Sequence, residues 1–421
     1  MPGNAARATC KPFELGNGLD LIVLGSGGPR AAGRAAASYV IAIAGTPRYM
    51  IDAGSGSFTR LGESGLASDK LDTILLTHLH IDHAGDVPDL VKSRDLLGKG
   101  PLRFRIVGPS GQGLYPSTST FIERLLGPQG AFAYLSTFRN PLKLEATDIA
   151  FDLERAPETI IQEDGVTITA AAVDHRDVPA VAYRIEYRGH SVVISGDLAS
   201  KRGQIAALAR GATVLVYDAA VLDPPGSPAE LYELHTPPAR IGEVASQAGV
   251  ATLILSHIPP DVEAEADAAL ASVRTAFRGE VMFAHDCLHL RVGEKPEESA
   301  MTATSAMHRV LFELTSDDPK VWEGVLNNVE NVRRALGARA TEVEVVSHGK
   351  GLGLLIASTT PLGERVGQLA TEGVVFAACQ NTMKKLGIDK SQLLRAATTV
   401  DSGVAEVVRK QEAGWTYLKG G

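Results

Sequence analysis

Short apolar runs of strand length, separated by turns rich in Gly, Pro, Asp and Ser, recur along most of the chain. Runs of this kind that are bounded by turn residues are typical of buried strands. Before residue 260 they predict strands at Leu19–Gly25, Ser38–Ala44, Tyr49–Asp52, Thr73–Leu76, Val166–Val173, Ser191–Ser195 and Thr252–Leu255. A predicted helix, Ala239–Ala248, precedes the last of these strands. The pattern predicts a mixed α/β (α+β) fold for this part of the chain.

The pattern changes after Gly293–Ser299, a polar segment that contains proline and has the composition of a linker. Beyond it, strands are predicted at His308–Leu314, Val343–Ser347 and Val374–Ala377. Apolar residues at helical spacing form one face of a predicted helix: Val321, Val325, Val329, Val332 and Leu336. Strands that alternate with helices indicate a small parallel sheet. A chain of 421 residues is too long for one ordinary domain, and we predict two, residues 1–298 and 305–421.

A cluster of potential metal ligands directly follows the predicted strand at Thr73–Leu76. His78, His80, Asp82 and His83 fall within six consecutive residues. Neutral imidazole and carboxylate together suit zinc and other first-row metal ions. Four such groups this close together cannot all bind one ion without strain, so two neighbouring ions are the natural interpretation. The alternative is a solvated loop that is rich in histidine.

Residues of the same chemical type follow three later predicted strands: Asp174 and His175, Asp197, and His257. One such residue alone is usually an ordinary turn residue or a polar group that is bonded locally. Three such strand ends, together with the cluster, favour a shared metal site over a solvated loop. His285 and His289 are interpreted instead as outward-facing residues of the last strand of this domain.

Composition and charge narrow the range of partners and compartments. The formal net charge is −8 and no dense run of Lys or Arg is present, so nucleic acid is not an expected partner. No apolar stretch reaches the length of a membrane span, and the segment Met1–Lys11 lacks the apolar core of a signal peptide. We therefore expect a cytoplasmic protein without a membrane partner. The turn Gly25–Gly28 lacks both the dinucleotide fingerprint and the P-loop lysine, so no nucleotide cofactor is expected.

The three cysteines, Cys10, Cys287 and Cys379, are too few and too scattered for a disulfide framework, and a reducing compartment is expected. We expect Cys10 to be a free thiol in the N-terminal segment and Cys287 to lie in a strand. Cys379 follows a predicted strand and precedes a predicted helix start. Because a helix N-terminus favours the thiolate, Cys379 should be the most reactive of the three. A buried structural cysteine is the alternative.

The order His-x-His-x-Asp-His, then His, then Gly-Asp, then a late His resembles the metallo-β-lactamase-fold hydrolases over residues 19–290. The resemblance implies an αβ/βα sandwich with its metal site at the edge of two packed sheets. It implies that His78, His80 and His175 bind a first metal ion. It implies that Asp82, His83 and His257 bind a second ion, with Asp197 bridging the two and Asp82 also counted as catalytic. The implied cofactor is a pair of Zn²⁺ ions, with Mn²⁺ or Fe²⁺ as alternatives.

Two further segments, Asp174–Ala180 and His235–Pro238, resemble the arylsulfatase and tRNA 3′-processing ribonuclease branch of these hydrolases. The resemblance implies that a metal-bridged hydroxide attacks phosphorus or sulfur and that His235 protonates the leaving group. Without this resemblance, His235 would be interpreted as a residue that precedes a helix and has no chemical role. The basic, Gly-rich arm of the tRNA-processing members is not identifiable between the His cluster and His175. A small-molecule sulfate ester or phosphodiester is therefore the expected substrate.

In the second domain, Val346–Gly351, the segment around Cys379, Ser402–Val404 and Gly414–Tyr417 resemble the DsrE/DsrF-like sulfur-relay family. The resemblance implies that Cys379 carries sulfur as a persulfide, and that His348 lines the same pocket. It also implies a homo-oligomer, with sulfur-relay proteins as candidate partners. The domain could equally serve as an oligomerisation module.

Two other functions compete with the hydrolase. One is a mononuclear-iron persulfide dioxygenase fed by Cys379, and the other is an assembly module with an inactive site. A mononuclear site needs only two His and one Asp and has no use for Asp82, His83, His257 and His235 together. The complete ligand set therefore favours a binuclear metal-dependent hydrolase.

Overall fold

The computed structural model describes residues 10, 12–30, 33–97, 102–137, 142–293, 308–336 and 341–420. The chain divides into two compact units, Met1–Lys295 and Pro296–Gly421, and each is described by itself. The segment predicted to be a linker, Gly293–Ser299, lies outside the described residues beyond Gly293.

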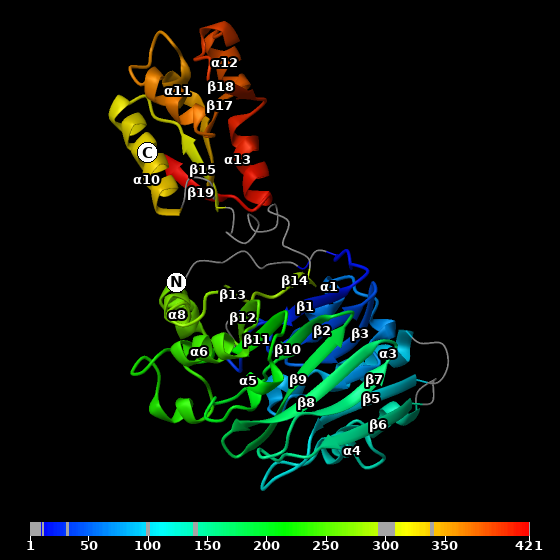
Figure 1. Ribbon diagram of the computed structural model, residues 1–421. Helices are drawn as coiled ribbons and strands as arrows, with labels where there is room; N and C mark the ends of the chain where they lie inside the picture. Colours follow the sequence, from blue (N-terminus) through cyan, green and yellow to red (C-terminus); the bar gives the residue numbers. More distant parts are fainter. Residues whose placement is uncertain are drawn as a thin grey trace. The chain divides into compact units, whose positions relative to one another are not determined.

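Two seven-stranded sheets pack face to face in the described part of the first unit (Figure 1). The first sheet has the order β14 (Leu288–Val292), β1 (Leu19–Gly25), β2 (Ser38–Ile43), β3 (Thr46–Ile51), β4 (Thr73–Leu75), β5 (Leu102–Pro109) and β6 (Leu142–Ile149). The second has the order β13 (Glu280–Phe283), β12 (Thr252–Ser256), β11 (Val214–Asp218), β10 (His190–Ile194), β9 (Val178–Tyr187), β8 (Val166–His175) and β7 (Glu158–Glu163). Buried residues of both sheets, such as Val23 and Ile194, form the core between them.

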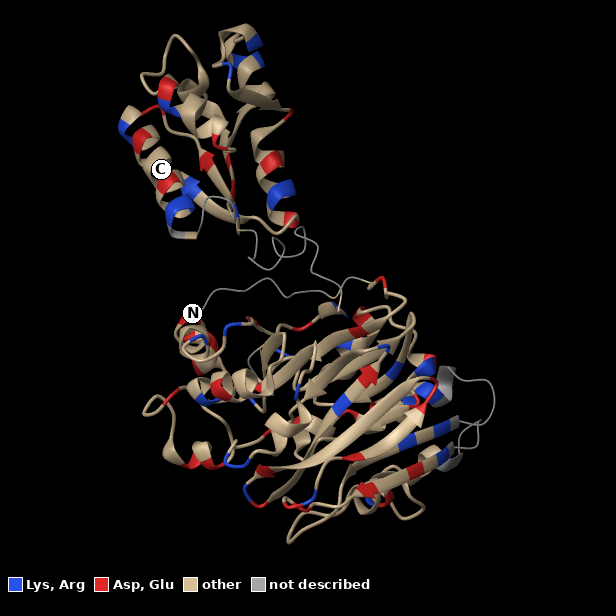
Figure 2. Cartoon of the chain, in the orientation of Figure 1, with Lys and Arg blue, Asp and Glu red and all other residues tan. Residues whose placement is uncertain are grey.

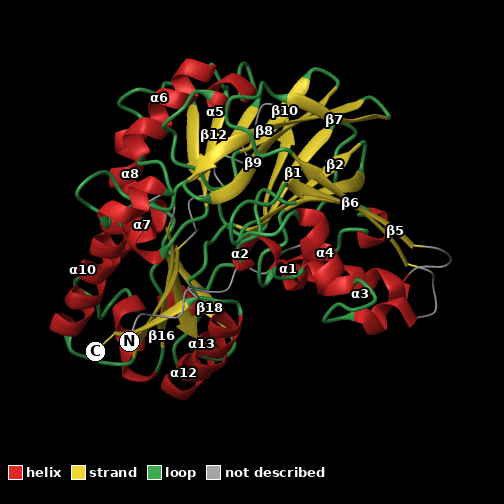
Figure 3. Ribbon diagram, turned by 90° about the horizontal axis from the view of Figure 1, so that it is seen from below, coloured by secondary structure: helices red, strands yellow, loops and turns green. Residues whose placement is uncertain are grey.

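Helices cover the outer faces of both sheets, as Figure 3 shows. On the first sheet these are α1 (Ser57–Glu63), α2 (Ile81–Ala84), α3 (Val87–Leu97) and α4 (Thr118–Leu126). On the second they are α5 (Gln204–Leu208), α6 (Pro238–Ala248) and α8 (Ala266–Val273), with the short α7 (Pro260–Ala264) before α8. Single 3₁₀ turns lie at η1 (Ser68–Lys70), η2 (Ala133–Thr137) and η3 (Ala229–Glu233). This layering confirms the predicted αβ/βα sandwich.

Several strand boundaries differ from the prediction by one to three residues, and two of these differences lie at tight turns. The β2–β3 hairpin turns at Ala44 and Gly45, which both have positive φ, so β3 begins at Thr46 rather than at Tyr49. Pro47 suggested a longer turn, but it lies beside a β-bulge, where proline is tolerated. Strand β8 runs on to include His175, which pairs with Val178 across a tight turn.

The segment from Phe283 to His289 is not one strand, so the predicted alternation of outward residues is wrong there. Strand β13 ends at Phe283 and β14 begins at Leu288, and Cys287 lies in the turn between them with φ 69°. His289 lies on β14, where its Nε2 is 2.7 Å from Oδ1 of the buried Asp20.

The cysteine predictions need a larger correction. Cys10 is buried and forms a disulfide with Cys287, with their Cα atoms 5.2 Å apart. The prediction of a free Cys10 is therefore wrong, and Cys379 is the cysteine that remains free. A pairing of two residues that are 277 positions apart leaves no signal in the spacing of the cysteines.

The second unit holds a five-stranded sheet whose described pairings are all parallel. Its order is β18 (Ala397–Val400), β17 (Val375–Cys379), β16 (Thr341–Ser347), β15 (His308–Leu314) and β19 (Thr416–Gly420). Its other elements are α10 (Pro319–Leu336), η5 (Gly349–Leu355), α11 (Gly363–Thr371), α12 (Gln380–Leu386), η6 (Lys390–Gln392) and α13 (Gly403–Glu412). Helices α10 and α11 pack on one face and α13 on the other. The predicted small parallel sheet is confirmed. Among the described residues, no helix is long and apolar enough to cross a membrane.

Candidate metal centre

Six strands of the first domain bring acidic and histidine side chains together at their carboxyl ends. Asp52 follows β3, the His78–His83 segment follows β4, and His175 ends β8. Asp197 follows β10, Asp218 ends β11, and His257 follows β12. The two sheets are joined here by a hydrogen bond of 2.8 Å, which the Val181 N–H on β9 donates to the carbonyl of Thr77 after β4. Ligand-type residues that the sequence places far apart are thus collected at one edge of the sandwich.

Asp197 lies at the centre of this group. Its Oδ1 is 3.4 Å from His83 Nε2, and its Oδ2 is 3.3 Å from His257 Nε2. The same Oδ2 lies 3.9 Å from His78 Nε2 and 4.0 Å from His175 Nε2. The preceding residue must be glycine for Asp197 to take this position. Gly196 has a φ of 59°, and a Cβ there would lie only 2.7 Å from Thr77 Cβ. The carboxylate therefore stands between two sets of imidazoles, as a bridging ligand would.

The possible ligand atoms of the described residues fall into three overlapping groups. His78, His80 and His175 gather with Asp197 in the first, Asp82, His83 and His257 form the second, and Asp197, Asp218, His235 and His257 form the third. Within each group the ligand atoms lie within 4.8 Å of one another. His257 has a φ of 60°, a left-handed conformation that costs roughly 1–3 kcal/mol in a non-glycine residue and is typical of functional sites.

The pattern of hydrogen bonds fits metal ions at these positions. His83 Nε2, His175 Nε2 and Asp197 Oδ1 are buried and have no hydrogen-bond partner. The opposite ring nitrogens are occupied: His175 Nδ1 donates to the Leu234 carbonyl at 2.8 Å, and His83 Nδ1 is 2.8 Å from Asp52 Oδ2. A proton held on Nδ1 leaves a lone pair on Nε2, which is the tautomer that a metal-binding histidine needs. Buried polar atoms without partners are costly, and cations at the two positions would satisfy all three.

Burial and charge act in opposite directions on the pKa values of this group. Burial lowers the pKa of His175 to about 4 and holds that of His78 well below its usual range. Burial also opposes the charged form of His83, but the carboxylates of Asp197 and Asp52 outweigh it and raise the pKa of His83. Burial would raise the pKa of Asp197, yet the neighbouring His257 and His83 hold it well below its usual range. Asp197 is therefore ionised at neutral pH, as a bridging carboxylate must be.

Asp52 and Thr77 support the centre and were not singled out as site residues from the sequence. Asp52 accepts hydrogen bonds at 2.7 Å from both the backbone N–H and the hydroxyl of Thr77, and it also holds His83. Carboxylates that orient a metal-binding histidine in this way tune its basicity. The available signal was the position of Asp52 at the end of a predicted strand.

His235 belongs to the third group and is paired with Asp218. Its Nδ1 is 2.8 Å from Asp218 Oδ2, and its ring centroid is 5.5 Å from that of His175. Burial would lower the pKa of His235, but the charge and hydrogen bond of Asp218 raise it to about 9. The imidazolium is therefore populated at neutral pH and can donate a proton. Asp218 was missed, although it ends the apolar strand β11 just as the other site residues end theirs.

Asp218 also lies close to a candidate metal ligand. Its Oδ1 is 3.8 Å from His257 Nδ1, so one carboxylate contacts both the proton-donor candidate and a candidate ligand. A cavity beside these residues is lined by Tyr39, Asp52, His83, Asp197, Asp218 and His257, among others.

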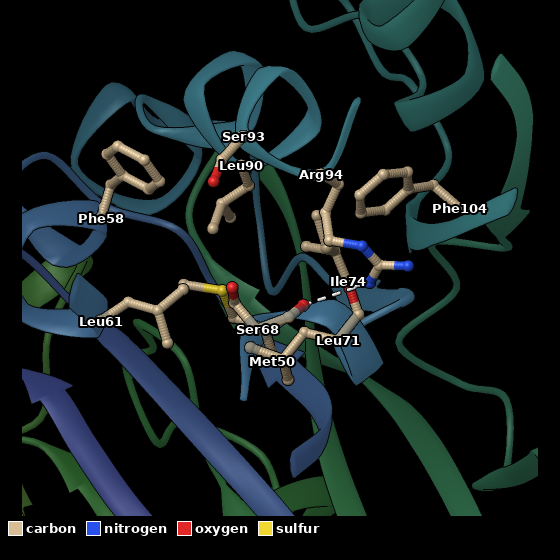
Figure 4. A pocket seen from close by; sticks show the side chains of 10 residues that line it. All are labelled: Met50, Phe58, Leu61, Ser68, Leu71, Ile74, Leu90, Ser93, Arg94 and Phe104. Atoms are coloured by element: carbon tan, nitrogen blue, oxygen red, sulfur yellow. Dashed lines mark hydrogen bonds between the residues drawn. The ribbon is translucent and has the colours of Figure 1, made fainter. Parts of the chain in front are cut away.

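Another pocket, shown in Figure 4, lies apart from this chemistry. Met50, Leu61 and Leu90 line it, and Arg94 closes one side by donating to the Leu71 carbonyl at 2.8 Å. Its lining is largely apolar and contains no His, Asp, Glu or Cys. It is a packing gap between sheet and helices rather than a reaction site.

In the second domain, Cys379 ends β17 and is the N-cap residue of α12, as the sequence suggested. Its Sγ accepts a hydrogen bond from the Gly403 N–H at 3.1 Å. Burial raises the pKa of this thiol, but hydrogen bonds from Thr382 and from backbone N–H groups outweigh it and lower the pKa. The side chain is nevertheless buried, with 4% exposure. The His348 ring also packs against Gly403, so closely that a Cβ on this glycine would lie 2.9 Å from His348 Cδ2.

The αβ/βα sandwich with a His/Asp cluster at its edge defines the class of metallo-β-lactamase-fold proteins. The β-lactamase superfamily domain matches residues 47–258, and the DsrE/DsrF-like family matches residues 323–419. A ribonuclease Z of Mycobacterium sp. (strain KMS) is 30% identical over 293 residues, which cover 65% of this chain and 96% of that protein. The chain belongs to the β-lactamase superfamily and carries a C-terminal DsrE/DsrF-like domain.

Solved structures show the same fold. The metallo-β-lactamase-fold protein YhfI from Bacillus subtilis is 24% identical with a TM-score of 0.50, covering 65% of this chain and 99% of that one. The short form of human tRNase Z is 22% identical with a TM-score of 0.50, covering 65% of this chain and all (100%) of that one. The first domain is thus a metallo-β-lactamase-fold hydrolase related to ribonuclease Z, with side chains that fit divalent metal ions.

Proposed function

We propose that the first domain, residues 1–298, is a binuclear metal-dependent hydrolase that cleaves a phosphodiester or a sulfate ester. The observation that carries this proposal is the set of buried, unpartnered atoms on either side of Asp197. His78, His80 and His175 would hold one ion, Asp82, His83 and His257 the other, and Asp197 both. Zn²⁺ suits these ligands best, with Mn²⁺ or Fe²⁺ as alternatives. When bound, such ions supply a water of lowered pKa and stabilise negative charge on the substrate.

The protein's own residues would complete the reaction. The His235 imidazolium would donate its proton to the leaving oxygen, and Asp218 would hold that ring in place through Nδ1. Asp52 would fix the ring of His83 through its hydrogen bond, so that Nε2 faces the centre. His80 is only partly buried, which leaves its side of the cluster open to substrate.

Of the two ester types, the phosphodiester has the stronger support. Ribonucleases cleave phosphodiesters, and the curated relative reported above is named ribonuclease Z. That name counts against the expectation that nucleic acid is not a substrate. The arrangement of charge supports a small substrate, because basic and acidic residues are interspersed on the strands of the first domain (Figure 2). On β5, Arg103 is paired with Glu145 of β6 at 2.8 Å and Arg105 with Glu163 of β7 at 2.9 Å. Basic groups that are already neutralised offer little to an RNA backbone.

The test is turnover by the metal-loaded protein on bis-p-nitrophenyl phosphate, p-nitrophenyl sulfate, a precursor tRNA and glutathione persulfide. The proposal expects cleavage of the diester or of the sulfate. Cleavage of precursor tRNA with no small-ester turnover would replace the small-molecule substrate by RNA. Oxygen uptake with the persulfide, without ester cleavage, would instead support the persulfide dioxygenase.

For the second domain, residues 305–421, we propose that Cys379 carries sulfur and that the domain forms a homo-oligomer. The support is the lowered pKa of the thiol and the N–H groups around it. Because Cys379 is buried, only a small donor could reach it without a local opening. Treatment with glutathione persulfide should transfer its outer sulfur to the Cys379 thiolate and release glutathione as the leaving thiol, a gain of about 32 Da, one sulfur atom, which a reductant removes and Cys379→Ser abolishes. Absence of the adduct would leave oligomerisation, measured by light scattering, as the role of this domain.

A further inference from the structure

Three neighbouring strands of the second domain carry reactive side chains in a row at their carboxyl ends. Each of β15, β16 and β17 contributes one residue to the apolar cluster that packs against α13: Leu311, Val346 and Ala377. Glu313, His348 and Cys379 each lie two residues further along. Because side chains alternate between the two faces of a sheet, these three residues also face α13.

His348 and Cys379 are neighbours in this row. Ser347 pairs with Ala378 across β16 and β17, and the next residue on each side is His348 and Cys379. His348 is still extended, with φ −143° and ψ 173°, so the row continues past the end of β16, where neighbouring chains lie about 4.8 Å apart. Both side chains contact Gly403 at the start of α13. Its N–H donates to Cys379 Sγ at 3.1 Å, and a Cβ on it would lie 2.8 Å from His348 Cβ.

Glu313 holds the far side of the imidazole. His348 Nε2 is 2.7 Å from Glu313 Oε1, and the Tyr417 hydroxyl donates to Glu313 Oε2. Burial would raise the pKa of Glu313, but these two hydrogen bonds outweigh it and lower the pKa, so the carboxylate is ionised at neutral pH. An ionised carboxylate only accepts, so Nε2 carries a proton and Nδ1 is the nitrogen left to exchange one with a substrate. The ring is only partly buried, so it can regain that proton from solvent.

The backbone makes a second link between this histidine and the thiol. The Gly349 N–H donates to Thr382 Oγ1 at 3.0 Å, and the Thr382 hydroxyl is in turn hydrogen-bonded to Cys379. An oxygen that accepts from Gly349 keeps its own proton to give to the sulfur. A change at His348 can therefore reach the thiolate through Gly349 as well, and an experiment has to separate the two routes.

We propose that His348, oriented by Glu313, is the proton donor to the thiol that leaves when sulfur is transferred to Cys379. This inference rests on the proposed sulfur-carrier function and adds a residue to it. The Cys379 thiolate attacks the outer sulfur of glutathione persulfide, so that a new bond from Sγ to that sulfur forms and the S–S bond of the donor breaks. The electron pair of the broken bond stays on the glutathione sulfur, which takes the proton from His348 Nδ1 and leaves as the thiol. No oxidant or reductant is consumed.

The kinetic test compares two reactions of Cys379 in the full chain. Sulfur transfer from glutathione persulfide is followed as a gain of about 32 Da, one sulfur atom, on the peptide that contains Cys379. Alkylation by iodoacetamide is the reference, because the departing iodide needs no proton. His348→Ala should slow sulfur transfer by about 10²-fold, the low end of general acid catalysis because a thiolate leaves readily, and should leave alkylation near the wild-type rate.

Two further variants sharpen this test. His348→Gln keeps an N–H for Glu313 but has no proton to give, so it should transfer sulfur as slowly as His348→Ala. His308→Ala, at the opposite end of β15, is the matched control and should keep both rates. Equal slowing of transfer and alkylation in His348→Ala would show that His348 only supports the thiolate. A wild-type transfer rate in His348→Gln would show that it only holds the segment in place, and either result overturns the proton donor.

Glutathione disulfide separates this inference from the carrier function. Attack by Cys379 on this disulfide expels the same glutathione thiolate and leaves a mixed disulfide. If the wild-type chain takes no sulfur from the persulfide but forms the mixed disulfide, and forms it slowly in His348→Ala, the proton donor stands and only the carrier function fails. A Cys379 that reacts with neither reagent rejects both, because no thiolate then leaves beside His348.

Discussion

The two domains both place reactive groups at the carboxyl ends of strands, but they control them differently. At the candidate metal centre, side chains from six strand ends or the segments after them converge, and buried carboxylates set the protonation of the histidines. At Cys379, one thiol is surrounded mainly by backbone N–H groups and a threonine hydroxyl. The first arrangement depends on many charged partners, so removing one should disturb the rest. The second depends on helix positions, so single substitutions should change it by small amounts.

The largest expected effect is at Asp197, because it faces both ligand groups. Asp197→Ala should lose metal from both positions and reduce hydrolysis to background. Elemental analysis beside an activity assay measures this. Asp261→Ala, a carboxylate on α7 that pairs with Arg30 at the surface, is the matched control and should keep both ions. Loss of only one ion from the Asp197 variant would argue against a bridge.

His235→Ala is expected to have the next largest effect, with the metal content retained. General acid catalysis is typically worth ~10²–10⁴-fold, and it matters least when the leaving group departs unaided. The variant should therefore be slowed more on an alkyl ester than on a p-nitrophenyl ester. Equal slowing on both substrates would show that His235 does not donate a proton.

Asp52→Asn tests whether a carboxylate that is not itself a proposed ligand helps His83 to bind metal. Loss of a carboxylate that orients a metal-binding histidine typically weakens metal affinity by about 10–100-fold. The expected result is weaker retention of metal under a competing chelator, with a near-normal rate at saturating metal. Thr77→Val removes the hydroxyl bonded to Asp52 and should produce a smaller change in the same direction. If the Asp52 variant binds metal with wild-type affinity, Asp52 does not support metal binding.

The smallest expected effect concerns the thiol of the second domain. Because its pKa is lowered, the thiolate forms as pH rises through a value below the ordinary 9.0 of a cysteine. The rate of alkylation of Cys379 should rise with pH and reach half its maximum below pH 9. Thr382→Val removes the hydroxyl hydrogen bond and should move this midpoint upward, whereas Thr382→Ser should not. A thiol that resists alkylation at every pH would mark Cys379 as structural.

The sequence predicted the parts of the site that depend on local order. Most proposed ligands lie at the end of a strand or in the segment that follows it, and strand ends are visible in runs of apolar residues followed by polar ones. Asp82 and His83 lie on the short helix α2 and were visible through the density of ligand-type residues around them. The supporting residues Asp52 and Asp218 were visible as strand ends too, but their role depends on which histidine lies across the fold from each. The Cys10–Cys287 disulfide joins the segment before β1 to the turn before β14, and β1 and β14 pair with each other although they come from opposite ends of the first domain. Long-range pairing of that kind has no signature in local spacing.

The first domain is expected to hold two metal ions, and elemental analysis of the purified wild-type chain is the decisive measurement. We predict two divalent ions per chain, chiefly zinc, and a joint loss of both in the Asp197 variant. One iron per chain, with oxygen consumed in the presence of a persulfide, would contradict the binuclear hydrolase and support the dioxygenase in its place.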